Sequence, residues 1–208
     1  MLYTSRTVKA SSRSDRTRQA IIEAAGRLWM ERGLHGVGLE EVASAAGVTR
    51  RTVYLHFGSK AALLLAYVYD SESRAGLPGL VAAMTAAKTP AEIFDVLGQI
   101  QVQYVPQVFP SMRVVHAARA SEPAAAEVWD DRMRGRRTVF RAVATRLSEM
   151  GRLDPALSID DAVGLIWVLT SPHMYEYLVV DGGWSLDRYR GHVVRLLSRA
   201  LLVSGPIS

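Results

Sequence analysis

The sequence predicts an all-helical protein of two parts, a three-helix unit of the helix-turn-helix type followed by a larger helical domain. Apolar residues recur three and four positions apart along most of the chain, and caps, prolines and glycines separate these stretches. The stretch Leu39–Lys60 has the composition and spacing of a helix-turn-helix. We expect a flexible basic arm at residues 1–13, the helix-turn-helix domain at 14–58 and the helical domain at 59–208.

The first helix is predicted to begin at Ser14 or Asp15, either of which is a good N-cap, and to end at Gly33. One face carries apolar side chains at the i, i+4, i+7, i+8 spacing of a buried stripe. The members of this stripe are Ile21, Ala25, Leu28 and Trp29.

The helix-turn-helix itself is predicted from residue chemistry at its turn. A short helix over Leu39–Ala46 ends at Gly47, because the position after a helix favours the left-handed backbone that glycine adopts without strain. Thr49 is an N-cap for a second helix that buries Val53 and Phe57. A small residue, Ala43, lets the two helices approach closely.

The outward face of the second helix carries polar and basic side chains that packing does not require. Arginine can donate two hydrogen bonds to guanine, threonine can contact thymine or phosphate, and tyrosine, histidine and lysine commonly contact phosphates. The expected DNA-contacting residues of this region are Thr49, Arg50, Arg51, Thr52, Tyr54, His56 and Lys60. The alternative is a solvated basic helix on an ordinary helical protein.

The distribution of charge favours a polyanionic partner for the N-terminal part. Residues 1–60 contain 10 Lys/Arg and 5 Asp/Glu, whereas residues 61–208 contain 15 of each, so the first part carries the whole net charge of +5. The N-terminal arm is rich in serine and basic residues. It is expected either to be a nonspecific tail or to enter the minor groove of DNA with Arg6, Lys9 and Arg13.

After the helix-turn-helix, a helix is predicted to begin at Ser59 and run to about Ala75. Five further helices are predicted after it. Gly76, Pro78 and Gly79 are expected to break or kink the helix that begins at Ser59, and Pro106 and Pro110 to separate two others. Pro172 is expected to kink the fourth of the five. Their predicted ranges are 89–104, 111–119, 123–150, from Ser158 through Pro172, and from Ser185 to about Ala200.

The predicted helix 123–150 carries a basic group with two readings. Arg132, Arg134, Arg136, Arg137 and Arg141 are either a second nucleic-acid surface or a solvated face. The neutral balance of this half of the chain, with Asp130 and Asp131 nearby, favours the solvated face.

Residues Asp15–Leu65 resemble the DNA-binding domain of the TetR family of one-component regulators. The resemblance rests on AIIEAAGRLWMERG, EEVASAAGVTRRTVYLHF and GSKAALL. Gly38 stands where the family usually has a capping Thr or Ser, and Arg51 stands where Gly is common. The resemblance implies a phosphate contact at Thr17, a palindromic double-stranded DNA operator, a homodimer and release of the operator by a small-molecule effector.

The resemblance also implies an effector pocket in the helical domain. Bulky, semi-polar side chains suit such a cavity, although the same residues would also suit a plain core. The candidate pocket residues are Tyr104, Phe109, Met112, His116, Trp129, Met133, Trp167, Met174 and Tyr175.

A helix that is apolar on most of its faces, such as the one that Ser158 caps, is expected to pack both inward and against a second subunit. With the last helix it would form an intermolecular four-helix bundle in a homodimer. The candidate interface residues are Leu165, Val168, Leu169, Val193, Leu196, Leu197 and Ala200.

No pattern of catalytic or cofactor-binding residues is found, so we expect neither an enzyme nor a bound cofactor or metal. His173 and Glu176 have a metal-ligand spacing but lack a second pair. The chain has no cysteine, which fits a cytoplasmic location, and no apolar run near the roughly 20 residues that span a bilayer.

The sequence therefore predicts a site-specific transcriptional regulator. The resemblance to the TetR family implies that it is a repressor. A nonspecific DNA-coating protein, and an enzyme or carrier that uses the C-terminal pocket, are the alternatives.

Overall fold

The computed structural model describes residues 13–203, and within them the ordered segments are helical apart from an isolated backbone bridge between Leu153 and Leu202. The predicted arm lies outside the described residues except for Arg13, which begins the first helix. The helices are α1 (Arg13–Arg32), α2 (Leu39–Ala45), α3 (Arg50–Phe57), α4 (Lys60–Arg74), α5 (Leu77–Ala86), α6 (Pro90–Gln99), α7 (Val105–Ala118), α8 (Pro123–Glu149), α9 (Ile159–Leu169), α10 (Pro172–Tyr175) and α11 (Leu186–Leu201), with π-helical segments η1 (Ile100–Tyr104) and η2 (Glu176–Asp181).

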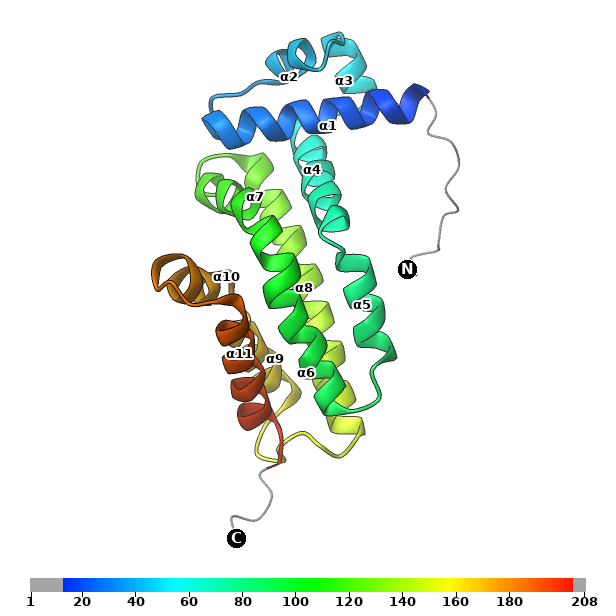
Figure 1. The fold of residues 1–208 in the computed structure, drawn as a ribbon. Helices are drawn as coiled ribbons and strands as arrows, with labels where there is room; N and C mark the ends of the chain where they lie inside the picture. Colours follow the sequence, from blue (N-terminus) through cyan, green and yellow to red (C-terminus); the bar gives the residue numbers. More distant parts are fainter. Residues whose placement is uncertain (1–12, 204–208) are drawn as a thin grey trace.

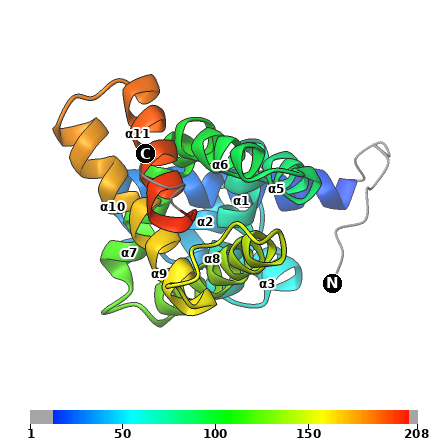
Figure 2. The ribbon, with the colours of Figure 1, turned by 90° about the horizontal axis from the view of Figure 1, so that it is seen from below.

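The helices form two regions that helix α4 connects. Helices α1, α2 and α3 lie at one end of the molecule, and α4 leaves that end to run alongside α8 (Figure 1). Helices α6, α8, α9 and α11 gather at the other end, as the view from below shows (Figure 2). The predicted all-helical fold, with a helix-turn-helix before a larger helical part, is confirmed.

Two clusters of buried apolar residues stabilise these regions. The first, here called the proximal core, includes Ile21, Trp29, Val42 and Val53 of the helix-turn-helix region. It also takes in side chains of α4, α7 and α8, namely Leu63, Leu64, Val68, Val115, Ala118, Ala125 and Val128. The helix-turn-helix is therefore packed on the helical domain, and its core does not close at the predicted boundary of residue 58.

The second cluster, here called the distal core, is built from α6, α8, α9 and α11. Its deeply buried members include Phe94, Leu147, Ile166, Tyr189 and Leu197, each no more than 1% exposed. These residues lie at helical spacing on their own elements, so each amphipathic helix turns its apolar side to the same centre. No helix among the described residues has the length and apolar character needed to cross a bilayer.

Helices α6 and α7 are continuous, which corrects the predicted break at Pro106 and Pro110. The chain passes from α6 through η1 into α7, and both prolines lie within α7. Pro106 is the second residue of α7 and follows the π-helical segment η1 almost directly. Pro110 is internal and costs about 3 kcal/mol, but burial of Val108 and Phe109 beside it contributes about 1.5–3 kcal/mol each.

The predicted break after α4 is present, but the helix that follows it was missed. Gly76 has φ +78° and ends α4, and Pro78 then lies in the first turn of α5. Leu80 and Met84 of α5 are buried at i, i+4 spacing. Two signals for α5 were present in the sequence, namely a proline suited to a helix start and the apolar pair Leu80 and Met84. They were overlooked because Pro78 was interpreted only as a helix breaker.

Around Pro172 the chain forms two helices, where a kink was predicted. Helix α9 ends at Leu169, and α10 starts at Pro172 under a Ser171 cap whose Oγ accepts from Met174 N at 3.1 Å. Proline thus opens the new helix, in the position where it needs no backbone N–H.

The packing of α1 against α4 gives a test of the fold. Gly26 of α1 faces Tyr67 of α4, and a Cβ on Gly26 would lie 2.2 Å from the Tyr67 ring, which itself packs edge-on against Trp29. We expect Gly26→Ala to reduce the free energy of unfolding by about 1–3 kcal/mol, measured by urea denaturation.

The matched control is Gly135→Ala in the middle of α8, where an added Cβ has no neighbour within 4 Å. It should increase the free energy of unfolding by about 0.5–1 kcal/mol, because glycine is a poor helix former. Equal stabilisation by both substitutions would contradict the close α1–α4 contact.

Candidate nucleic-acid interface

The turn between α2 and α3 has the geometry that its residues predict. Gly47 has φ +67°, and the Val48 N–H donates to the Ala43 carbonyl oxygen at 3.0 Å. Ala43 and Val53 are 3% and 0% exposed, so a small and an apolar residue meet between the helices. The turn and this contact fix the direction of α3, as predicted.

Side-chain caps hold the starts of both helices. Thr49 Oγ1 accepts from Thr52 N at 3.1 Å and caps α3. Gly38 has no side chain to cap α2, but Glu41 Oε2 accepts from Gly38 N at 3.0 Å. That hydrogen bond, followed by the pair with Arg32 at 2.7 Å, holds the pKa of Glu41 below its usual value. Glu41 thus supplies its half of a capping box, while the side-chain acceptor that a Thr or Ser would add at position 38 is absent.

The exposed face of α3 carries the residues best placed to contact DNA. Arg50, Arg51 and Tyr54 are exposed, and the Arg50 guanidinium lies 5.5 Å from the Tyr54 ring centre. Among the other predicted residues, Thr49 is exposed while Thr52 and His56 are partly buried. The structure adds Leu55, which is 76% exposed.

Leu55 was missed because the expected DNA contacts were restricted to polar and basic side chains. The signal was its position four residues after Arg51, which puts it on the same exposed side of α3. A leucine this exposed can contact the thymine methyl group in the major groove.

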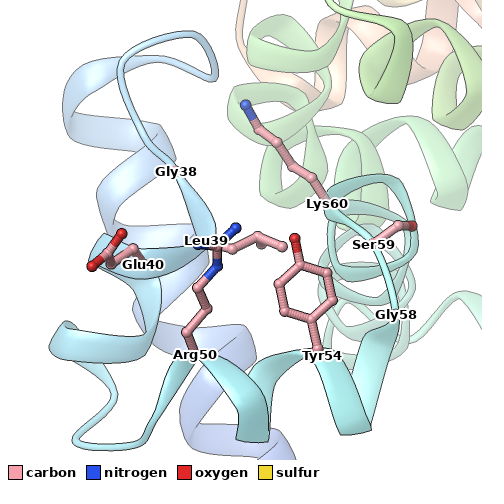
Figure 3. Close-up of a pocket in the computed structure, with 8 residues that line it drawn as sticks. All are labelled: Gly38, Leu39, Glu40, Arg50, Tyr54, Gly58, Ser59 and Lys60. Atoms are coloured by element: carbon pink, nitrogen blue, oxygen red, sulfur yellow. The ribbon is translucent and has the colours of Figure 1, made fainter.

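A hollow of about 430 Å³ borders this face, and Figure 3 shows the side chains around it. Arg50 and Tyr54 of α3 project into the space between the start of α2 and the start of α4. Gly38, Leu39 and Glu40 line one side, and Gly58, Ser59 and Lys60 the other. A backbone phosphate fits such a hollow, because the first N–H groups of the long helix α4 and a guanidinium both border it.

Lys60 departs from its predicted role. Its Nζ donates to the Leu34 carbonyl oxygen at 2.8 Å and lies 3.3 Å from Glu122 Oε2, and Figure 3 shows it pointing away from Tyr54. Lys60 therefore links the helix-turn-helix to the start of α8. A phosphate contact by Lys60 requires it to leave both partners.

His35 belongs to the same junction. Its Nδ1 lies 3.3 Å from Glu122 Oε2, and its Nε2 is in hydrogen-bond contact with Ser121 Oγ at 2.5 Å. The loop before α2 and the loop before α8 are thus joined by a small polar cluster of His35, Lys60, Ser121 and Glu122.

Thr17, the phosphate contact implied by the resemblance, lies in the second turn of α1. Its hydroxyl donates to the Arg13 carbonyl oxygen at 3.0 Å, so the side chain is engaged with its own helix. Next to it, the Arg18 guanidinium lies 5.1 Å from the Phe57 ring centre and ties α1 to the end of α3.

The predicted effector-pocket residues divide between the two cores. Tyr104, Phe109, Trp167, Met174 and Tyr175 belong to the distal core, and Met112 and Trp129 to the proximal one. His116 stands between them, 4.6 Å from the Trp129 ring and 5.5 Å from the His173 ring. Met133 is partly buried. The pocket stays a prediction.

The predicted dimer interface needs one correction. Val193 and Leu197 are 0% exposed and belong to the distal core of their own protomer, because the stripe of α11 faces α6 and α9. Val168 and Leu196 are 64% and 40% exposed. They and the partly buried Leu165, Leu169 and Ala200 remain candidates for the interface.

Comparison with known proteins assigns the motif to a family. Residues 21–67 match the model of the bacterial regulatory proteins of the tetR family. This chain carries a TetR-family DNA-binding domain. A transcriptional regulator of Mycobacterium tuberculosis is 37% identical to it over 67 residues, 32% of this chain and 33% of that protein. AcrR of Shigella flexneri is 36% identical over 94 residues, 45% of this chain and 42% of AcrR.

Two solved structures share the fold of this chain over most of its length. NalD of Pseudomonas aeruginosa, described as the secondary repressor of a multidrug efflux pump, has a TM-score of 0.72 at 22% identity and covers 92% of this chain and 98% of its own. SmeT in complex with triclosan has a TM-score of 0.74 at 19% identity, with coverage of 91% and 93%. The matched sequence relatives overlap this chain over less than half of their own length.

No group of three or more potential metal ligands gathers within residues 13–203. His173 and Glu176 lie on adjoining segments α10 and η2, and Glu176 Oε1 lies 3.5 Å from Arg113 Nε.

Arg51 gives a test of base reading by the TetR-family domain. Because its side chain is exposed on α3, we expect Arg51→Ala to reduce discrimination between preferred and scrambled sites by about 1–3 kcal/mol. Competition binding at fixed salt measures this difference. An equal loss of affinity for every sequence would assign Arg51 to the phosphate backbone.

Glu122 gives a test of the junction. Glu122→Gln removes the carboxylate that holds Lys60, so DNA affinity should rise and the salt dependence of binding should steepen by about one unit of log–log slope. Glu127→Gln is the control, because Glu127 is an exposed residue of the same helix and the same charge is removed. If both variants change the slope equally, general charge and not Lys60 is responsible.

Proposed function

We propose that this protein is a site-specific DNA-binding transcriptional regulator, acting as a homodimer and most simply as a repressor that a small-molecule effector releases. The observation that carries the proposal is the exposed basic face of α3, held by the α2–α3 turn within residues 1–60, which account for the whole net charge of +5. Its family membership supports the same function.

A dimer follows from how such proteins read DNA. One α3 contacts one major groove, and two copies about 34–36 Å apart read the halves of a palindrome. The exposed apolar side chains Val168 of α9 and Leu196 of α11 offer a surface that a second copy can cover.

An effector acts in this proposal by favouring one of two positions of the recognition helices. Helix α4 would transmit this change of position to the DNA-binding domain, because it packs on both α1 and α8. NalD and SmeT, whose fold this chain shares, are described as a repressor and as a triclosan complex, which supports repression and a small-molecule effector as the first hypothesis.

The deciding experiment is selection of bound sequences from a random DNA pool at near-physiological salt. A palindromic motif with two half-sites supports the proposal. A nonspecific DNA-binding protein would give no enriched motif and a steep salt dependence. A ligand-binding protein without a DNA role would retain no DNA at all.

The interface gives a further test. Val168→Arg and Leu196→Arg each place a charge in the proposed contact, and either should convert the dimer into a monomer in sedimentation experiments. Met30→Arg is the control, since Met30 is 43% exposed but lies on α1. Dimers that persist in both α9 and α11 variants would rule out this face.

A further inference from the structure

Arg136 of α8 is a cation inside the helical domain without a carboxylate partner. Its Nη2 donates to the Thr170 carbonyl oxygen at 2.5 Å and to Thr170 Oγ1 at 3.0 Å, at the end of α9. No ion pair to Arg136 is found among residues 13–203, in contrast to Arg132 one turn earlier, which pairs with Glu72 at 2.7 Å. Burial lowers the pKa of Arg136 to about 10, so it stays charged at neutral pH.

Aromatic rings surround this guanidinium. Its central carbon lies 5.0 Å from the Phe140 ring centre and 4.8 Å from that of Trp167. Tyr104 and Tyr189 act electrostatically on Arg136, and burial raises the pKa of both phenols, so that both are neutral at pH 7. An apolar wall around a positive charge suits a ligand that has an apolar body and an anionic head.

The hydrogen-bond donors of Arg136 are only partly used. Its bonds all come from Nη2, which leaves Nε and Nη1 without protein partners in the described part of the chain. The only fully buried side-chain donor or acceptor without a partner there is the indole nitrogen of Trp29. Nε and Nη1 of Arg136 are therefore not completely buried.

Gln101 adds a second unused donor beside the same tyrosine. It is 2% exposed, and its Oε1 accepts from the Tyr189 hydroxyl at 3.1 Å. The amide nitrogen of Gln101 has no hydrogen-bond partner among residues 13–203. Like the two groups of Arg136, it is not completely buried. Around Tyr189 the unused groups are thus donors, which a carboxylate satisfies and an amine does not.

From this cluster we propose that Arg136 anchors the acidic head of a small organic acid with an apolar ring, with Gln101 as a second donor and Phe140 and Trp167 as walls. This inference rests on the proposed function, since it names the chemical class of the effector. The acid would lie beside Tyr104, whose hydroxyl donates to Glu72 of α4 at 2.8 Å. Binding there reaches the helix that leads to the DNA-binding domain.

The experiment is calorimetric titration of the full chain at pH 7 with two probes of one shape, 2-naphthoate and its neutral amide 2-naphthamide. The wild-type protein should bind naphthoate at least tenfold more tightly than naphthamide. Arg136→Met keeps an apolar stem and removes the charge, so naphthoate binding should weaken about 10- to 100-fold and the preference should vanish.

Arg137→Met is the matched control. Arg137 lies over the same Trp167 ring at 5.5 Å but is exposed, so its loss should change naphthoate affinity less than twofold. Equal binding of both probes by the wild type, no binding of naphthoate, or a preserved preference in a folded Arg136→Met protein would each overturn the proposal. The wild-type comparison decides the matter even if the variant does not fold.

Failure here is distinguishable from failure of the proposed function. A protein that selects a palindromic DNA motif but ignores naphthoate is a regulator with a different effector. A protein that binds naphthoate but selects no DNA is a ligand-binding protein without the proposed role.

Discussion

Helix α4 is the constraint on which the rest of the structure depends, because it belongs to both halves of the protein. Leu63, Leu64 and Val68 in its first half are buried in the proximal core. Glu72 in its second half is 5% exposed and pairs with Arg132 of α8 at 2.7 Å. A buried carboxylate that lost this partner would cost several kcal/mol, so the register of α4 against α8 is fixed.

Two polar contacts of unequal strength join α4 to α8. Near the start of α4, Lys60 and Glu122 are side chains about one-fifth exposed, and such a pair contributes little and weakens with salt. Near its end, the contact of Glu72 with Arg132 and Tyr104 is buried and has a second hydrogen bond. The outer contact can therefore open while the inner one keeps α4 docked.

Local chemistry made the helix-turn-helix predictable, whereas contacts between distant helices did not follow from the sequence. Gly47, Thr49 and Val53 act within a few residues of each other, so spacing alone identified their roles. The stripe of α11 was also visible, but a stripe does not say whether it faces its own core or a second subunit. That is why Val193 and Leu197 were assigned to the interface.

The basic group of α8 shows the same limit. Its arginines were read together as a solvated face, and Arg134, Arg137 and Arg141 are indeed exposed. Arg132 and Arg136, one turn apart, instead turn toward α4 and α9. The sequence contains the spacing but not the neighbours, and only the packed helices reveal that Arg132 has a carboxylate and Arg136 has none.

This difference between two arginines one turn apart explains how a binding event can reach α4. Arg132 is already paired with Glu72, so an anion gains more at Arg136, which is buried without a carboxylate partner. Tyr104 is coupled to both arginines, since it acts electrostatically on Arg136 and donates its hydroxyl to Glu72, the partner of Arg132. An anion shifts the equilibrium only as far as it favours one arrangement of these groups over another. Tyr104 stands at the end of the π-helical segment η1, a geometry often found at functional sites.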